Sequence, residues 1–223
     1  HNGSRGLGDV YKRQRQVCLV AHDIQAVTRQ FESIVHLEVC HIDEAVGKYG
    51  LENRLLPIGN QLLEIVAPTE PGTAAGRYLE RRGGDGGYMV ITQTDDHDSY
   101  KQNAAALGVR VANTIEHDGF HGMQLHPKDT GGAFFEIDHQ EGGDAPDGPW
   151  HPAGPRWSEF VRTDTIDAIV GVELQSPEPL DLAERWAAIA QAPLERDGTT
   201  PSFAFDNARI RFVPCSDGRP EGL

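Results

Sequence analysis

An internal repeat of 72 residues constrains the fold of this 223-residue chain more than any other feature. The segments 62–65 (LLEI) and 134–137 (FFEI) each carry one glutamate, Glu64 and Glu136, in a stretch that otherwise has the apolar character of a buried strand. A repeated pattern of this kind predicts that the chain is built from equivalent modules. Because a buried carboxylate is costly unless it is paired, protonated or bound to a metal ion, two carboxylates at equivalent positions predict one shared site.

The elements within each repeat are predicted to follow the order strand, helix, strand, strand, strand. Asp23 and Asp95 share the 72-residue offset and follow the first strand of each copy, where an aspartate can cap a helix. Gly59 and Asn60 suit a tight turn between the last two strands, and Gly108 suits the end of the second helix. The expected strands are 16–21, 37–42, 54–58 and 61–66 in the first copy, and 88–94, 109–115, 122–126 and 133–138 in the second, with a connecting helix at 73–82.

A third copy follows a Gly- and Pro-rich segment at 141–163, which we predict to be a linker. In that copy Arg211 stands where Glu64 stands in the first, so the third module is predicted to be a scaffold without the carboxylate. The sequence DVYKRQ lies within residues 1–14 and matches the translation of a common transposase adapter, so we expect these residues to be a non-native scar. The predicted domains are therefore a first module pair at 15–140, made of 15–72 and 83–140, the linker, and a third module with the truncated start of a fourth at 164–223.

The charge balance limits the class of partner. The chain has 34 Asp and Glu against 20 Lys and Arg, a net charge of −14, which becomes −16 when Arg5, Lys12, Arg13 and Asp9 of the scar are set aside. Such an acidic chain is not expected to bind nucleic acid or anionic membranes. No apolar run approaches the roughly 18 residues of a membrane span, and the three cysteines form no paired framework, which favours a reducing, cytoplasmic setting. We expect a small molecule as the partner.

The module order, with a glutamate on the last strand of each copy, resembles the vicinal oxygen chelate superfamily, which includes glyoxalase I, methylmalonyl-CoA epimerase, extradiol dioxygenases and bleomycin-resistance proteins. The segment 126–132 (HPKDTGG) is similar to the corresponding segment of methylmalonyl-CoA epimerases. The resemblance implies an α+β fold in which repeated βαβββ modules pair into a cup-shaped, half-open barrel sheet, with the third module and the truncated fourth forming a second pair. Such modules pair within one chain or between two chains, so a homodimer is among the implied arrangements.

The resemblance also implies a metal site. In that superfamily each module supplies ligands from its first and last strands, and the matching positions here are Gln16 on a first strand and Glu64 and Glu136 on the last strands. In the second module Tyr88 or Met89 stands where a histidine is often found, so the ligand at this position stays open. A divalent ion of unspecified identity, held by Gln16, Glu64 and Glu136, is the implied cofactor, and a site without metal is the alternative.

The implied function is a metal-dependent isomerase, epimerase or lyase that acts on a small oxygenated metabolite through an enediolate-type intermediate. Glu136 would move the proton, and His126 is a second candidate for acid/base chemistry because a three-residue turn would set it across from Glu136. The main alternative is a metal-free protein that binds and sequesters a small molecule, as bleomycin-resistance proteins do. An extradiol dioxygenase ranks lower, because it needs two histidines and one carboxylate and the first strands supply no histidine.

Overall fold

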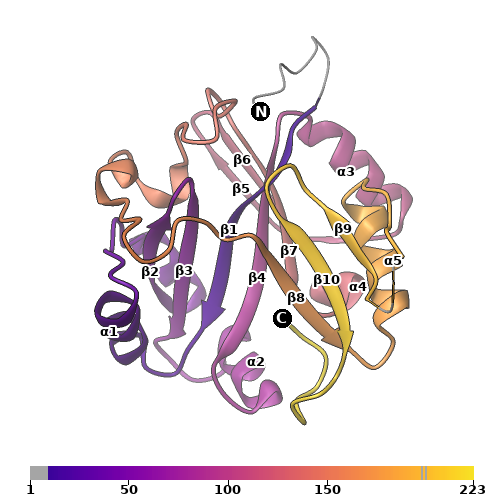
Figure 1. Cartoon of the computed structure of the whole chain (residues 1–223), viewed down its shortest axis with the longest axis horizontal. Coiled ribbons are helices and arrows are strands. Elements are labelled where there is room, and N and C mark those ends of the chain that lie inside the picture. Colours follow the sequence, from indigo (N-terminus) through magenta and orange to yellow (C-terminus); the bar gives the residue numbers. More distant parts are fainter. Residues whose placement is uncertain (1–9, 197, 199) are drawn as a thin grey trace.

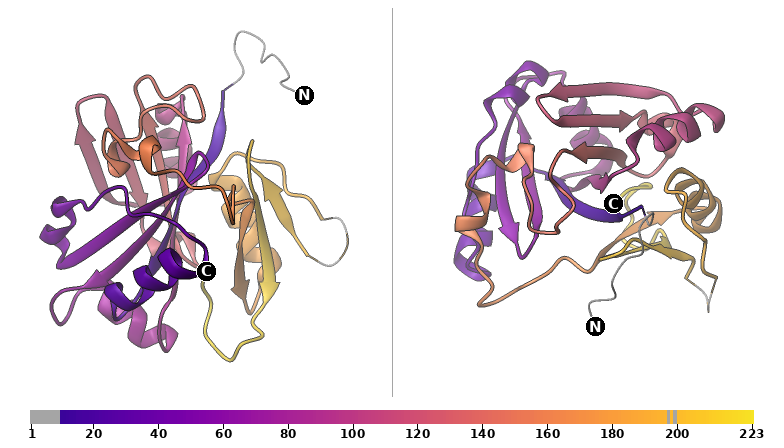
Figure 2. Two further views of the ribbon diagram at one scale, coloured as in Figure 1. Left: turned by 60° about the vertical axis from the view of Figure 1, so that its left-hand side comes forward. Right: turned by 90° about the horizontal axis from the view of Figure 1, so that it is seen from above.

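The computed structural model describes residues 10–196, 198 and 200–223 of the chain. In this part of the chain, seven strands form one curled sheet and three strands form a second, smaller sheet (Figure 1). The large sheet has the order β2-β3-β1-β4-β7-β6-β5 and forms a half-open barrel (Figure 2), which confirms the predicted α+β class and the cup. Its strands are β1 (Lys12–Val20), β2 (Leu51–Ile58), β3 (Gln61–Pro68), β4 (Gly86–Thr94), β5 (Val111–His117), β6 (Phe120–Leu125) and β7 (Phe134–Gln140).

The first module comprises β1, α1 (Ile24–Ile34), β2 and β3. α1 begins after Asp23, whose carboxylate accepts a hydrogen bond from the backbone N–H of Ala26, as expected of a helix cap. Gly59 has a φ of +59°, a conformation that glycine adopts without strain, and the turn that it forms joins β2 and β3 in antiparallel register. β3 then lies parallel to β1.

The second module has one strand more and shows the full predicted order, with β4, α3 (His97–Ala106), β5, β6 and β7. α3 is followed by Gly108 with a φ of +68°, as predicted from the sequence. β7 lies parallel to β4 in the same way as β3 lies parallel to β1. One difference from the expected module is α4 (Pro127–Thr130), a single helical turn inserted between β6 and β7.

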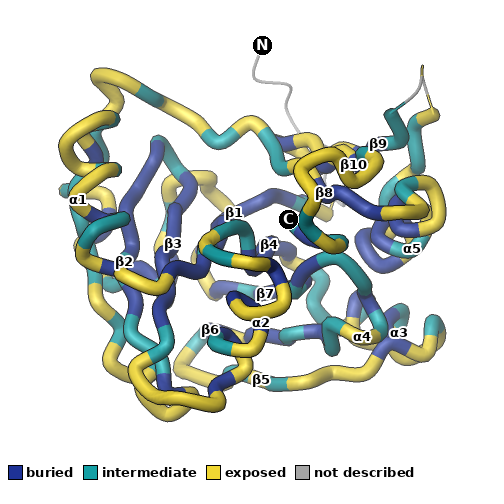
Figure 3. Tube along the Cα trace, turned by 90° about the horizontal axis from the view of Figure 1, so that it is seen from below, coloured by how far each residue is buried: buried dark blue, intermediate teal, exposed yellow. Residues whose placement is uncertain are grey.

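The two modules meet at their first strands, because β1 and β4 are antiparallel neighbours at the centre of the large sheet. The connecting helix α2 (Ala74–Arg82) is capped by Thr73, close to its predicted bounds. The central strands β1, β3, β4 and β7 are buried along most of their length (Figure 3). β3 and β7 therefore flank the central pair symmetrically, which places Glu64 and Glu136 in the wall of one cavity.

The strand predicted at 37–42 is the main error in the expected fold. This segment makes a single bridge, between His41 and Leu55 of β2, and its backbone then leaves the sheet. The carboxylate of Asp43 accepts from the backbone N–H of Ala45 and caps a 3-10 helix, η1 (Glu44–Tyr49). Side-chain capping therefore outcompetes strand pairing at this point of the chain.

Residues 164–223 contribute β8 (Gly171–Ser176), α5 (Pro179–Ile189), β9 (Ser202–Ala204) and β10 (Arg209–Pro214), with the sheet order β8-β10-β9. This unit packs against the second module, where the ring of Trp186 stacks on Phe135 at a centroid distance of 4.7 Å. Arg211, which stands where Glu64 stands in the first module, is exposed and forms an ion pair with Glu173. Among the described residues, none of the helices could span a lipid bilayer.

Two segments predicted to lie outside the modules are packed against them. Residues 12–14 begin β1 and pair with residues 92–94 of β4. The predicted linker folds back over the first module pair and contains η2 (His151–Ala153) and η3 (Trp157–Phe160), with Trp150 among its buried residues. The origin of residues 1–14 and the predicted domain boundaries stay predictions.

Candidate functional site

A cavity of about 250 Å³ lies within the large sheet, and both modules contribute to its wall. Gln16 and Glu64 come from the first module, and Gln124 and Glu136 come from the second. Residues around η1 and η2 close the cavity on two sides. Many of the other lining side chains are apolar, so the cavity suits a small molecule with a few polar groups; they are Ala45, Val46, Leu51, Val66, Met89, Ile91, Ile115, Phe120 and Pro152.

Glu64 is buried on β3 and both of its carboxylate oxygens have hydrogen-bond partners. Its Oε2 accepts from Gln16 Nε2 at 2.7 Å, and its Oε1 accepts from Asn53 Nδ2 at 2.8 Å. Burial raises the pKa of Glu64, and the hydrogen bonds from the two side-chain amides oppose this rise. The two amides therefore compensate for burial of the carboxylate.

The orientation of both amides follows from the groups on their far sides. Gln16 Oε1 accepts from the indole Nε1 of Trp150 at 2.9 Å, and Asn53 Oδ1 accepts from the backbone N–H of Asp43 at 2.9 Å. An indole N–H and a backbone N–H can only donate, so each amide must turn its oxygen toward that donor. Its NH₂ group is then directed at Glu64.

Glu136 is buried on β7 in a different environment. The facing residue on β6 is Gln124, which supplies a hydrogen bond to the carboxylate, and Asp138 lies two residues further along the same strand. Among the described residues, Glu136 Oε2 has no hydrogen-bond partner. Burial raises the pKa of Glu136 to about 7, the negative charge of Glu64 adds to this rise, and the hydrogen bond from Gln124 opposes it. This carboxyl can hold or release a proton near neutral pH.

Asp138 lies behind Glu136 and is fully buried. Neither of its carboxylate oxygens has a hydrogen-bond partner in the part of the chain that the structure describes. Burial raises its pKa well above the usual value, and the negative charge of Glu136 raises it further. Two neighbouring buried carboxyls disfavour double ionisation, so the pair holds at least one proton over a wide pH range.

Strand register decides which residue of the second module corresponds to Gln16. Gln16 lies opposite Leu62, two residues before Glu64, and Met89 lies opposite Phe134, two residues before Glu136. Met89, and not Tyr88, is therefore the counterpart of Gln16. A thioether is a soft ligand and does not match the oxygen ligands of the other positions.

The predicted metal ligands Gln16, Glu64 and Glu136 do not fit a divalent ion in the arrangement that the structure shows. Both oxygens of Glu64 accept amide N–H groups, and Gln16 Oε1 is directed at Trp150, which leaves Glu136 Oε2 as the unpartnered oxygen of the predicted ligand set. Hard cations need several oxygen lone pairs directed at one point. The described residues also contain no group of three His, Cys, Asp or Glu side chains that could hold a metal ion. The implied metal ion stays a prediction.

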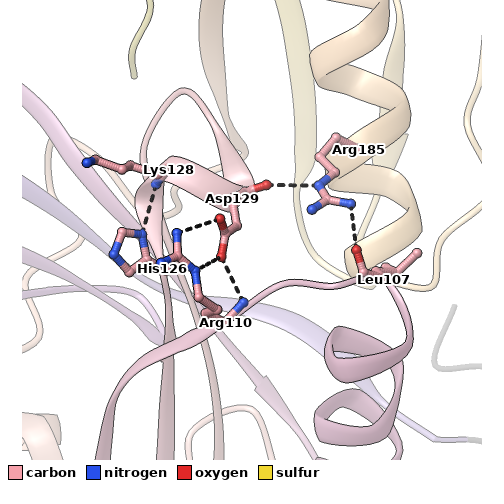
Figure 4. A network of polar contacts seen from close by, with 6 residues as sticks. All are labelled: Leu107, Arg110, His126, Lys128, Asp129 and Arg185. Atoms are coloured by element: carbon pink, nitrogen blue, oxygen red, sulfur yellow. Dashed lines mark hydrogen bonds and ion pairs between the residues drawn. The ribbon is translucent and has the colours of Figure 1, made fainter.

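His126 does not share this cavity with Gln16, Glu64 and Glu136. The residue opposite Glu136 is Gln124, so the predicted pairing of His126 with Glu136 is wrong. The reason is α4: His126 caps this helical turn, and its Nδ1 accepts from the backbone N–H of Lys128 (Figure 4). The side chain lines a separate hollow, together with residues of α2.

Asn53, Gln124 and Trp150 complete the polar network, although the sequence did not single them out. Asn53 and Gln124 lie on strands adjacent to the glutamate-bearing strands, a relation that requires the register to be known. Trp150 offered a clearer signal, because a large aromatic residue within a Gly- and Pro-rich segment is expected to be buried against something.

The paired modules, of which the second has the full βαβββ order, the half-open barrel and the glutamate on each last strand define a two-module cup with a small-molecule cavity. The model of the Glyoxalase/Bleomycin resistance protein/Dioxygenase superfamily matches residues 13–137. The chain belongs to this superfamily, which confirms the resemblance seen in the sequence. No curated protein matches the chain.

Several solved structures share the fold. A methylmalonyl-CoA epimerase in complex with methylmalonyl-CoA and NH₄⁺ is 24% identical, covers 62% of this chain and 99% of its own, and has a TM-score of 0.53. A variant of the Streptomyces coelicolor methylmalonyl-CoA epimerase in complex with 2-nitronate-propionyl-CoA is 23% identical, covers 57% and 96%, and has a TM-score of 0.51. A hypothetical protein from Bacillus halodurans C-125 is 17% identical, covers 58% and 94%, and also has a TM-score of 0.51. At these identities the likeness shows the fold.

Proposed function

We propose that the protein is an isomerase or epimerase that moves a proton at a carbon next to a carbonyl group of a small oxygenated metabolite. The observation that carries this proposal is the environment of Glu136: a buried carboxyl in the cavity, with Oε2 free of a partner among the described residues. Burial also raises the pKa of Glu136 to about 7, so the group can both accept and return a proton near neutral pH. The methylmalonyl-CoA epimerases of the same fold support this class of reaction.

The proposed step begins with a substrate C–H bond directed at Glu136 Oε2. The carboxylate takes the proton, and the electron pair of the C–H bond moves onto the neighbouring carbonyl oxygen to form an enolate. Return of the proton from Glu136 to a neighbouring atom gives the isomer. For the epimer, the enolate must first turn its other face to Glu136, which then returns the proton to the same carbon. Lys48 is the one lysine or arginine among the described side chains that line the cavity, and its charge favours the enolate.

A divalent ion is the further expectation that the superfamily carries, with Gln16, Glu64 and Glu136 as its ligands. Binding there requires Gln16 to turn its oxygen away from the Trp150 indole, so metal addition should change tryptophan fluorescence. Elemental analysis of the purified protein, compared with Glu64→Ala, tests this expectation. A metal content that Glu64→Ala leaves unaltered contradicts it.

Deuterium exchange tests the reaction class without knowledge of the natural substrate. A panel of 2-oxo acids and α-substituted acyl thioesters in D₂O, followed by proton NMR, should show incorporation at the carbon next to the carbonyl. Glu136→Gln should slow this exchange by about 100-fold or more, because it removes the acid/base group. Glu80→Gln, which changes an exposed residue of α2, is the matched control. Equal exchange in Glu136→Gln and the parent protein contradicts the proposed role.

The second candidate is a metal-free protein that binds a small molecule without converting it. The observation that favours it is the satisfied state of Glu64, whose two oxygens accept amide N–H groups in a largely apolar cavity. In this case a ligand found by thermal-shift screening should stabilise Glu136→Gln as much as the parent protein, and no deuterium should enter the ligand.

A further inference from the structure

Two segments close the cavity, and they are attached to the sheet in different ways. The front cover comprises residues 41–50 with η1, and the linker cover comprises residues 141–157 with η2. The linker cover is held by buried groups: Trp150 is 1% exposed, and the buried Arg15 donates to the carbonyl oxygen of Gly148 at 2.9 Å. None of the η1 side chains is buried, so the front cover has few apolar contacts of its own.

Asn53 is the buried link between the front cover and the cavity. Its Oδ1 accepts from the backbone N–H of Asp43, which begins the η1 turn, at 2.9 Å, and its Nδ2 donates to Glu64 Oε1 at 2.8 Å. The side chain is 2% exposed, so water does not substitute for either bond at low cost. A second side-chain bond links the cover to the rest of the molecule, from Asn113 Nδ2 to the hydroxyl oxygen of Tyr49 at 2.7 Å, and it is exposed to solvent.

We propose that the front cover is a lid and that Asn53 is the positioning residue that holds it closed against Glu64. Four hydrogen bonds run across the cavity without interruption, from Trp150 through Gln16, Glu64 and Asn53 to the backbone of Asp43. The linker cover is the fixed end of this chain of bonds, and the front cover is the movable end. A ligand that donates its own N–H or O–H to Glu64 Oε1 takes the acceptor used by Asn53, so such a ligand favours opening of the lid.

The lid proposal can be tested without a known ligand, because it does not depend on whether the protein is an enzyme or a binding protein. Lys48 is the one lysine or arginine between residues 41 and 50, so trypsin cleavage after Lys48 reports on the front cover. Under native conditions cleavage follows the population of the open form. Asn53→Ala should accelerate this cleavage about tenfold, because it removes a buried hydrogen bond to a carboxylate. Asn113→Ala removes this exposed bond, together with a longer one to Gln124 Oε1 at 3.4 Å, and should change the rate by less than about threefold.

Hydrogen exchange of the full chain, followed by mass spectrometry, separates lid opening from general unfolding. Asn53→Ala should raise exchange in residues 41–50 and leave the central strands β1 and β4 protected. Cleavage at the parental rate in Asn53→Ala, or equal acceleration in Asn113→Ala, overturns the proposal. If Asn53→Ala also deprotects the central strands, the milder Asn53→Ser variant is judged by the same two criteria.

Discussion

Glu136→Gln is expected to change how the stability of the fold depends on pH. Burial raises the pKa of Glu136 from 4.5 to about 7, so between these values the folded protein holds a proton that the unfolded chain has released. The free energy of unfolding of the parent protein therefore falls as the pH rises through this window, and the loss is complete above about pH 7. At about 1.4 kcal/mol for each unit of pKa, the loss is about 3 kcal/mol. A glutamine has the same shape and does not titrate, so the variant lacks this loss.

Urea unfolding followed by tryptophan fluorescence, from about pH 5 to about pH 8 in buffer with a chelator, measures the effect. The stability of Glu136→Gln relative to the parent should rise by about 3 kcal/mol across this range. The negative charge of Glu136 also raises the pKa of Asp138, so the difference between the two proteins reports on this pair of carboxyls together. Glu80→Gln, on the exposed side of α2, should follow the parent within about 0.5 kcal/mol. A difference between Glu136→Gln and the parent that stays constant with pH refutes the reasoning.

Three further changes probe the packing around the site. Trp150→Phe should lower the free energy of unfolding by about 1–3 kcal/mol in urea unfolding, because Gln16 Oε1 loses its donor; an unchanged value contradicts the hydrogen bond. Gly122→Ala should destabilise by about 1–3 kcal/mol in the same assay, since its Cβ would lie 3.1 Å from Asp138 Oδ1; a neutral result would mean that the carboxyl can move. Arg211→Ala removes an exposed ion pair and should lower the melting temperature by an amount equivalent to less than about 1 kcal/mol.

Local signals in the sequence were sufficient for most elements of the two modules. The apolar strands, the Asp23 cap and the glycine turn at Gly59 each depend on neighbouring residues, so they can be recognised from the chain alone. The 72-residue offset then assigned Glu64 and Glu136 to equivalent strands, and the structure places both in one cavity. The prediction of a strand at 37–42 is wrong. The residue pattern of this segment is typical of a strand, whereas the Asp43 cap that follows it directs the backbone out of the sheet.

The sequence by itself determined the repeated module and the two carboxylates, because these follow from periodicity and from the cost of burying charge. The cup was implied by the resemblance to the superfamily. Only the tertiary structure decided the neighbours of those carboxylates. A single turn of helix moved His126 out of the site, and strand register selected Met89 over Tyr88. The linker folds back so that Trp150 lies beside Gln16, and its indole N–H sets the orientation of the Gln16 amide. These contacts join residues far apart in the chain, and no local pattern encodes the distance between them.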